Sequence, residues 1–221
     1  MTEAQARDEI CRVGRSLFAR GYAHATAGNI SVRLPDGGCL ITPTDACLGF
    51  LDPAQLARLD PQGRHTSGGV ASKTIGLHTA IYAAARRFDA ATACVIHTHS
   101  THCVALTLTN DADELLPPVT PYFVMKVGHV PVIPYHRPGA PESVATASDA
   151  IRRYGDAGTP IRALMLARLG PNVWHASPAS AMAVLEELEE TARLMCLCVP
   201  PPEPLDDAAI AELRREFGAR W

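Results

Sequence analysis

Several features that would place this chain of 221 residues in a particular class are missing from its sequence. No run of five or more basic residues occurs and the formal net charge is -3, which argues against nucleic acid or an anionic membrane surface as a partner. No apolar stretch approaches the roughly 18 residues of a membrane span, and the first residues form an amphipathic charged segment rather than a signal sequence. We therefore expect a cytoplasmic protein.

Regularly spaced cysteines are lacking as well. The seven cysteines are an odd number and include no CxxC pair, which favours reduced, mostly buried thiols. Internal repeats and low-complexity tracts do not occur. The chain is 47% hydrophobic, enough to bury a core. It is also shorter than the roughly 250–300 residues at which chains split, so we expect a single domain over residues 1–221.

Hydrophobic periodicity predicts helices and strands along the chain. Apolar residues recur with a period of about 3.6 in segments that we expect to be helical, residues 3–20, 72–87, 141–154 (closed by Gly155), 178–198 and 206–220. ISVRL and CLITP flank a Pro-Asp-Gly-Gly turn and predict a β-hairpin, and a second hairpin is expected around Gly170-Pro171. ATACVIHTH has the length and branching of a buried strand. The pattern is typical of a mixed sheet flanked by helices.

The strongest chemical signal is the segment VIHTHSTHC, residues 95–103. Side chains alternate faces along a strand, so His97 and His99 are expected on the same side, roughly 6–7 Å apart. Two imidazoles in that arrangement suit Zn²⁺, Fe²⁺ or Mn²⁺. His102 is expected in the first turn of the following helix, facing either toward the pair or away from it. A solvated polar strand end explains the same residues equally well.

Five segments in this order resemble the class II aldolase/adducin family, AGNISVR, LITPT, Ser72–His78, VIHTHSTH and EELEETARL. The likeness is greatest to the branch of decarboxylases that act on 3-oxo-tetronate 4-phosphate, and it covers nearly the whole chain. The resemblance implies a three-layer α/β/α domain with a central, mainly antiparallel sheet. It also implies a homotetramer with active sites between subunits, and a divalent metal, usually zinc, held by three histidines.

Carried over position by position, the resemblance assigns two of the metal ligands to His97 and His99. It places Gly28, Asn29, Thr44 and Ser72 where the family binds a substrate phosphate. A glycine turn lets backbone N–H groups approach an anion, and hydroxyls add donors without charge. The residues themselves also allow a plain tight turn at Gly28-Asn29 and a helix N-cap at Ser72.

The resemblance further places Tyr122 and residues 135–137 (Tyr-His-Arg) near the rim of the pocket. Packing or a turn is the alternative role for these residues, and we favour it from the sequence.

Three positions depart from the family pattern. The third histidine ligand is Leu169 here, which cannot bind metal, and the acid/base glutamate is Thr74, whose hydroxyl is hardly acidic. Asp45 replaces a glycine in the TPT turn and would bring a carboxylate near the phosphate. At about 4 Å and an effective dielectric near 20, two unit charges repel by roughly 4 kcal/mol. Arg168 or Lys73 would have to offset that repulsion.

Our leading hypothesis is a carbon–carbon lyase, decarboxylating or retro-aldol, for a small oxo- or hydroxy-acid or sugar derivative. His102, His78 or Asp45 would complete its metal site. The candidate catalytic residues are Lys73, Thr74, Asp45 and Arg168. Three alternatives stay open: an iron-dependent oxygenase built on two histidines and a carboxylate, metal-free catalysis in the same pocket, and a non-catalytic binding or structural subunit.

Overall fold

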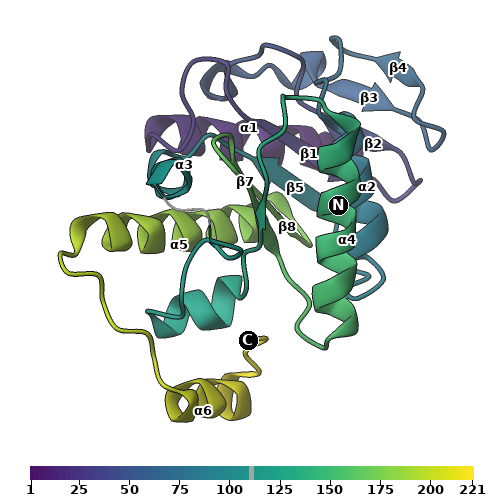
Figure 1. The fold of residues 1–221 in the computed structure, drawn as a ribbon. Coiled ribbons are helices and arrows are strands. Elements are labelled where there is room, and N and C mark those ends of the chain that lie inside the picture. Colours follow the sequence, from purple (N-terminus) through teal and green to yellow (C-terminus); the bar gives the residue numbers. More distant parts are fainter. Residues whose placement is uncertain (110–111) are drawn as a thin grey trace.

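An eight-stranded sheet separates two layers of helices (Figure 1). The computed structural model describes residues 1–109 and 112–221. Neighbouring strands are antiparallel except for the last pair, which is parallel. Their order across the sheet is β4 (His65–Ser67), β3 (Ala57–Leu59), β2 (Cys39–Ile41), β1 (Asn29–Arg33), β5 (Cys94–His97), β8 (Gly170–His175), β7 (Ala163–Leu166) and β6 (Val132–Ile133). The expected α/β/α fold with a mainly antiparallel sheet is confirmed.

Helices cover both faces of this sheet, as Figure 1 shows. One face carries α1 (Glu3–Ala19), α3 (Thr101–Thr109) and α5 (Pro178–Leu197). The other carries α2 (Ile75–Ala85) and α4 (Pro141–Asp156). The last helix, α6 (Asp207–Phe217), packs near a short π-helical segment, Phe123–Val127. Short 3₁₀ segments occur at Leu48–Phe50 and Pro53–Gln55. No helix among the described residues is long and apolar enough to cross a membrane.

The alternation of side chains along β5 decides what each helical layer contacts. Cys94 and Ile96 belong to the core beneath α1 and α5, whereas Val95 packs in the second core beneath α2 and α4. His97 is two residues beyond Val95 and therefore lies on the α2/α4 face. The imidazole of His97 is thus on the side of the sheet that α2 covers.

Several boundaries differ from the sequence prediction, and α2 and α6 are shorter than expected. Strand β5 ends at His97 instead of including His99, because the chain turns there into α3. Gly155 lies inside α4, where its missing side chain makes room for the ring of Phe88, and so it does not close the helix. Gly170 and Pro171 belong to β8, and the turn lies just before them, at Arg168 with its positive φ of 64°. The first hairpin and helices α1 and α5 are confirmed.

Candidate active site

Three buried polar side chains lie next to one another on adjacent strands. Asn29, His97 and Asn172 are Cα partners across β1, β5 and β8, which puts all three on the same face of the sheet. Their exposed fractions are 6%, 4% and 0%, respectively. We call these three residues the polar row. It lies on the face that α2 covers.

Two glycines allow the starts of β1 and β8 to lie close to the backbone at the end of β5. Gly28 has φ +88°, and a Cβ there would come within 2.7 Å of the backbone oxygen of His97. Gly170 has φ +146°, and a Cβ there would fall on the backbone oxygen of Thr98. Any side chain at these positions would push β1 or β8 away from the histidine. Gly28 thus has a packing function, and its predicted contact with a substrate phosphate stays a prediction.

The hydrogen bond of His97 fixes its tautomer. Nδ1 lies 2.9 Å from the carbonyl oxygen of Pro171, which can only accept, so Nδ1 carries the proton and Nε2 keeps its lone pair. Burial, assisted by the neighbouring His99, lowers the pKa of His97 to about 4, against an opposing effect of the Pro171 bond. The ring is therefore neutral near neutral pH, and its Nε2 is an acceptor.

A second buried imidazole, His78 on α2, lies against the polar row. Its Nδ1 is 2.7 Å from the hydroxyl of Ser31, which also contacts the hydroxyl of Tyr82 at 2.8 Å. Burial lowers the pKa of His78 to about 3, and the charge of His97 contributes to the shift. Its Nε2 is buried without a hydrogen-bond partner. His78 therefore adds a neutral nitrogen to the polar surroundings of His97.

Several side-chain atoms of this region are buried without a hydrogen-bond partner in the part of the chain that the structure describes, namely Oδ1 of Asn29, both Oδ1 and Nδ2 of Asn172, and Nε2 of His78. An unpaired buried polar atom costs about 1–3 kcal/mol of stability. Folded proteins pair most such groups, so a concentration of unpaired atoms calls for an explanation. A binding site that meets its partners in a ligand provides one.

A cavity of about 130 Å³ opens beside the polar row. Its polar lining includes His97, Asn172, Lys73, Thr74, His136 and Arg137. Leu166 and Leu169 form part of its apolar wall. Lys73 and Arg137 are exposed and bring positive charge to the mouth, which favours an anionic ligand.

The residues predicted to bind a phosphate are not among those that line this cavity. Thr44 and Asp45 form the turn after β2, where Asp45 is exposed and has φ +57°. Ser72 is buried, and its hydroxyl lies 3.0 Å from that of Thr74. The alternative of an N-cap at Ser72 is wrong, because α2 begins after Thr74. Their contacts with a substrate stay predictions.

The predicted metal ligands do not come together as a set of three. The ring centroids of His97 and His99 are 5.1 Å apart, and His24 lies 6.3 Å from His99. His102 instead faces α5, where its Nδ1 contacts Glu189 at 2.8 Å. The same carboxylate accepts the backbone N–H groups of His102 and Cys103 at the start of α3. The structure therefore does not place His102 with the pair.

Leu169, which the resemblance places where the family has its third ligand, packs against the core beneath α2 and α4. Across residues 1–109 and 112–221, no group of three His, Cys, Asp or Glu side chains is arranged to hold a metal ion. The donor set around His97 consequently does not fit a metal bound by three ligands.

Arg168 also lies apart from the cavity beside the polar row. It is exposed in the turn before β8, and its backbone N–H donates to the hydroxyl of Thr107 at 2.9 Å. It borders a separate depression together with Tyr135 and Asp113. Lys73 and Thr74 are the predicted catalytic residues that do line the cavity of the polar row. The catalytic assignments themselves stay predictions.

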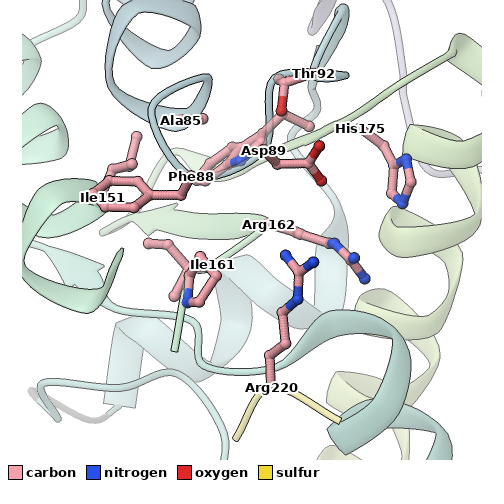
Figure 2. A pocket seen from close by; sticks show the side chains of 11 residues that line it. Ala85, Phe88, Asp89, Thr92, Ile151, Ile161, Arg162, His175 and Arg220 are labelled. Carbon is pink, nitrogen blue, oxygen red and sulfur yellow. The ribbon is translucent and has the colours of Figure 1, made fainter. Parts of the chain in front are cut away.

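Charged side chains lie near the ends of β5 and β8 that are farthest from the polar row (Figure 2). There Arg162 and Arg220 direct their guanidinium groups toward the space near Asp89 and His175. Burial, and secondly the charge of Arg220, lower the pKa of Arg162. The cavity between these groups is only about 10 Å³, room for no more than one water molecule. This end is charged but closed.

The fold and the site define the class of the protein. A profile described as "Class II Aldolase and Adducin N-terminal domain" matches residues 8–196, and the chain belongs to the class II aldolase/adducin family. It is 51% identical over 227 residues to the 3-oxo-tetronate 4-phosphate decarboxylase of Cupriavidus necator, covering 100% of this chain and 99% of that relative. Identity to the decarboxylase of the same name from Escherichia coli (strain K12) is 40%, over 96% of each chain.

Solved structures agree with this placement. YgbL from Klebsiella pneumoniae is similar with a TM-score of 0.84 at 40% identity, over 97% of this chain and 100% of that one. An L-fuculose-1-phosphate aldolase from Thermus thermophilus is similar with a TM-score of 0.73 at 25% identity, over 87% and 93% of the two chains. The homologues of this chain are thus lyases of the class II aldolase family.

Reasoning from the sequence missed Asn172 as a site residue and favoured packing for His136 and Arg137. For Asn172 a signal was present, since an amide directly after Gly170-Pro171 interrupts an otherwise apolar strand. For the other two residues no local pattern distinguishes a loop that lines a cavity from one that only turns.

Proposed function

We propose that the chain is a carbon–carbon lyase that decarboxylates a phosphorylated four-carbon 3-oxo acid, 3-oxo-tetronate 4-phosphate or a close analogue. The observation that carries the proposal is the end-to-end likeness to a decarboxylase of that compound, 51% over the whole chain. The cavity beside the polar row supports it, because two cationic side chains at its mouth suit a substrate with two anionic ends.

The chemistry of decarboxylation tolerates the loss of the acid/base glutamate. When the bond between C1 and C2 of a 3-oxo acid breaks, carbon dioxide leaves and the electron pair forms an enolate whose charge rests on the 3-oxo oxygen. C2 then takes a proton from water, which yields a three-carbon ketone phosphate. No base is needed for the first step, whereas retro-aldol cleavage must first deprotonate a hydroxyl. Thr74 therefore favours decarboxylation over retro-aldol cleavage.

The lining residues divide this work between them. Lys73 and Arg137 attract the carboxylate and the phosphate. The free Nε2 of His97 accepts a hydrogen bond from a substrate hydroxyl. Leu166 and Leu169 border the same cavity and displace water from the carboxylate, which weakens the solvation that opposes its departure as carbon dioxide.

Class II aldolases typically depend on a divalent metal, which supplies an electrophile for the substrate carbonyl. Because the donor set here does not complete such a site, we route no step through a metal. The resemblance predicts zinc, with iron or manganese as alternatives, whereas the donors around His97 predict turnover without added metal. The homotetramer stays a prediction. Elemental analysis of purified protein and light scattering test them.

The test is carbon dioxide release from 3-oxo-tetronate 4-phosphate above the spontaneous rate, with the same acid lacking its phosphate as the control. We expect turnover with the phosphorylated acid and a KM raised about 100-fold without the phosphate, since ion-paired hydrogen bonds contribute about 1.5–3 kcal/mol each. Absence of release, with or without added Zn²⁺, Mn²⁺ or Fe²⁺, would favour the non-catalytic alternative. Oxygen uptake with Fe²⁺ would instead indicate an oxygenase.

A further inference from the structure

Asn172 is the most deeply buried side chain of the polar row. It is 0% exposed, and neither its Oδ1 nor its Nδ2 has a hydrogen-bond partner. Its Cα partner on β7 is the apolar Leu164, and the residues that follow it, Val173 and Trp174, are buried core residues. A protein that needed only packing here would do better with a leucine, which has nearly the same shape and no polar atoms.

Asn172 lines a cavity together with His97. The cavity of about 130 Å³ is several times larger than the roughly 10–15 Å³ that one water molecule requires. Its position next to His97 puts the amide beside the group that we assign to the substrate hydroxyl. The unpaired amide therefore belongs to the wall of a cavity that is large enough for a small ligand and not only for one trapped water.

The tautomer of His97 limits what that imidazole can do for an oxyanion. Its only proton is held by the carbonyl of Pro171, so its free Nε2 can accept a hydrogen bond but cannot donate one. Thr74 has a hydroxyl bonded to Ser72, and the cations Lys73 and Arg137 lie at the exposed mouth. On the strand next to His97, Nδ2 of Asn172 is a buried donor without a partner among the described residues.

We propose that Asn172 donates a hydrogen bond from Nδ2 to the 3-oxo oxygen of the substrate and stabilises the charge that this oxygen acquires as carbon dioxide leaves. This assignment rests on the proposed function. The electron pair of the C1–C2 bond moves into the enolate, the N–H of the amide stays on nitrogen, and C2 later takes its proton from water. A buried neutral donor aimed at a developing oxyanion contributes about 10²–10³ to the rate in enzymes that use one. Asn172 thus takes over the electrophilic function that the family's third ligand position, Leu169, no longer supports.

Two variants of Asn172 separate catalysis from structure. In Asn172→Leu we expect kcat to fall about 100-fold while the melting temperature rises, because an unpaired buried amide is replaced by an apolar group of similar shape. Asn172→Asp keeps the shape but has no N–H to donate, and it should lose at least as much activity. Gln62→Leu, an exposed amide on a turn, is the matched control and should change neither quantity.

A binding experiment tests the same hydrogen bond without turnover. By calorimetry, Asn172→Leu should weaken the binding of dihydroxyacetone phosphate, a ketone, about 10-fold. Binding of glycerol 3-phosphate, the matching alcohol, should change by less than about 2-fold, since it lacks the carbonyl that the amide contacts.

The outcomes distinguish the inference from the proposed function. Wild-type protein that releases no carbon dioxide contradicts the proposed function. The comparison of ketone binding between wild type and Asn172→Leu then still tests whether Asn172 contacts the carbonyl oxygen. Equal ketone binding by wild type and Asn172→Leu overturns the inference, as does a variant with full kcat. A lower melting temperature in Asn172→Leu would also overturn it, because the amide would then be a structural group with partners inside the protein.

Discussion

Polar side chains lie near both ends of strands β5 and β8, and the two ends differ in charge and in cavity volume. At one end, the neutral side chains of the polar row lie beside a cavity of about 130 Å³ with unpaired atoms. At the other, the charged Arg162, Arg220 and Asp89 surround a cavity of about 10 Å³ (Figure 2). The charged end has no room for a ligand. Open volume next to unpaired neutral atoms is therefore a better mark of this site than charge is.

The comparison also separates two ways in which buried polar groups reduce stability. Arg162 remains partly accessible although its Nε is buried without a partner among the described residues, so water reaches only part of its guanidinium. Asn172 and His78 are fully buried and meet no solvent. Fully buried polar groups without partners lower the stability of the fold, and they are expected where function requires them. The predictions below test that distinction, from the largest expected effect to the smallest.

The largest effect is expected for the glycine that begins β8. Gly170→Ala places a Cβ on the backbone oxygen of Thr98 and strains a φ of +146°, and we expect it to lower the free energy of unfolding by about 2–4 kcal/mol. Gly158→Ala is the matched control, with φ +86° and nothing within 4 Å of the added carbon. It should cost about 1 kcal/mol, from backbone strain alone. Urea unfolding measures both, and equal losses would contradict the close approach of β8 to β5.

Acid should destabilise the polar-row end more than the charged end. The pKa of His78 is about 3 in the folded chain and 6.5 ordinarily, so the unfolded chain binds the proton first as the pH falls. The stability that depends on neutral His78 is complete above pH 6.5 and is lost as the pH falls toward 3, with a slope of about 1.4 kcal/mol per pH unit per proton.

His78→Asn should remove about one proton from that slope, measured by unfolding between pH 4 and 6.5. Burial also lowers the pKa of His175 at the other end, but this ring is only partly buried. His175→Asn should therefore change the slope less. A slope that is the same in wild type and in His78→Asn would show that His78 is not buried in neutral form.

Turnover should depend on one end of the strands only. His97→Asn keeps an amide near the carbonyl of Pro171 and removes the free Nε2, so we expect kcat/KM to fall about 30-fold, as for one lost hydrogen bond of about 2 kcal/mol. His175→Asn should change it by less than about 2-fold, which is within the spread of groups that do not touch the substrate. Comparable losses in the two variants would move the site away from the polar row.

The smallest effect is expected at Arg220. Its guanidinium lowers the pKa of Arg162, so Arg220→Met should relieve that repulsion and leave the free energy of unfolding within about 0.5 kcal/mol of wild type. The rate of carbon dioxide release should not change. A large loss of activity would give the charged end a function that its small cavity does not suggest.

Local patterns were sufficient for much of this fold. The period of 3.6 predicted α1 and α5, and the Pro-Asp-Gly-Gly turn predicted the pairing of β1 with β2. The family motifs also identify His97 from the sequence alone. These features are local, or they repeat a known spacing, and a single sequence shows both.

The assembly of the polar row could not be predicted in the same way. Asn29, His97 and Asn172 meet only through the register of three strands that are far apart in sequence. The sequence predicted departures from the family pattern at Thr74 and Leu169, but it did not show that Asn172 lies on the strand next to His97. Likewise, the hydrogen bond from His97 to Pro171 decides which nitrogen is free, and no sequence pattern reports it.

The most direct test of the account is the rate of carbon dioxide release by chelator-treated protein whose metal content has been measured. With 3-oxo-tetronate 4-phosphate as substrate, we expect the same kcat before and after adding one equivalent of Zn²⁺, since the donors around His97 do not complete a metal site. Release that appears only when zinc is restored would contradict the account, and it would return the electrophilic function to a metal bound by His97 and His99.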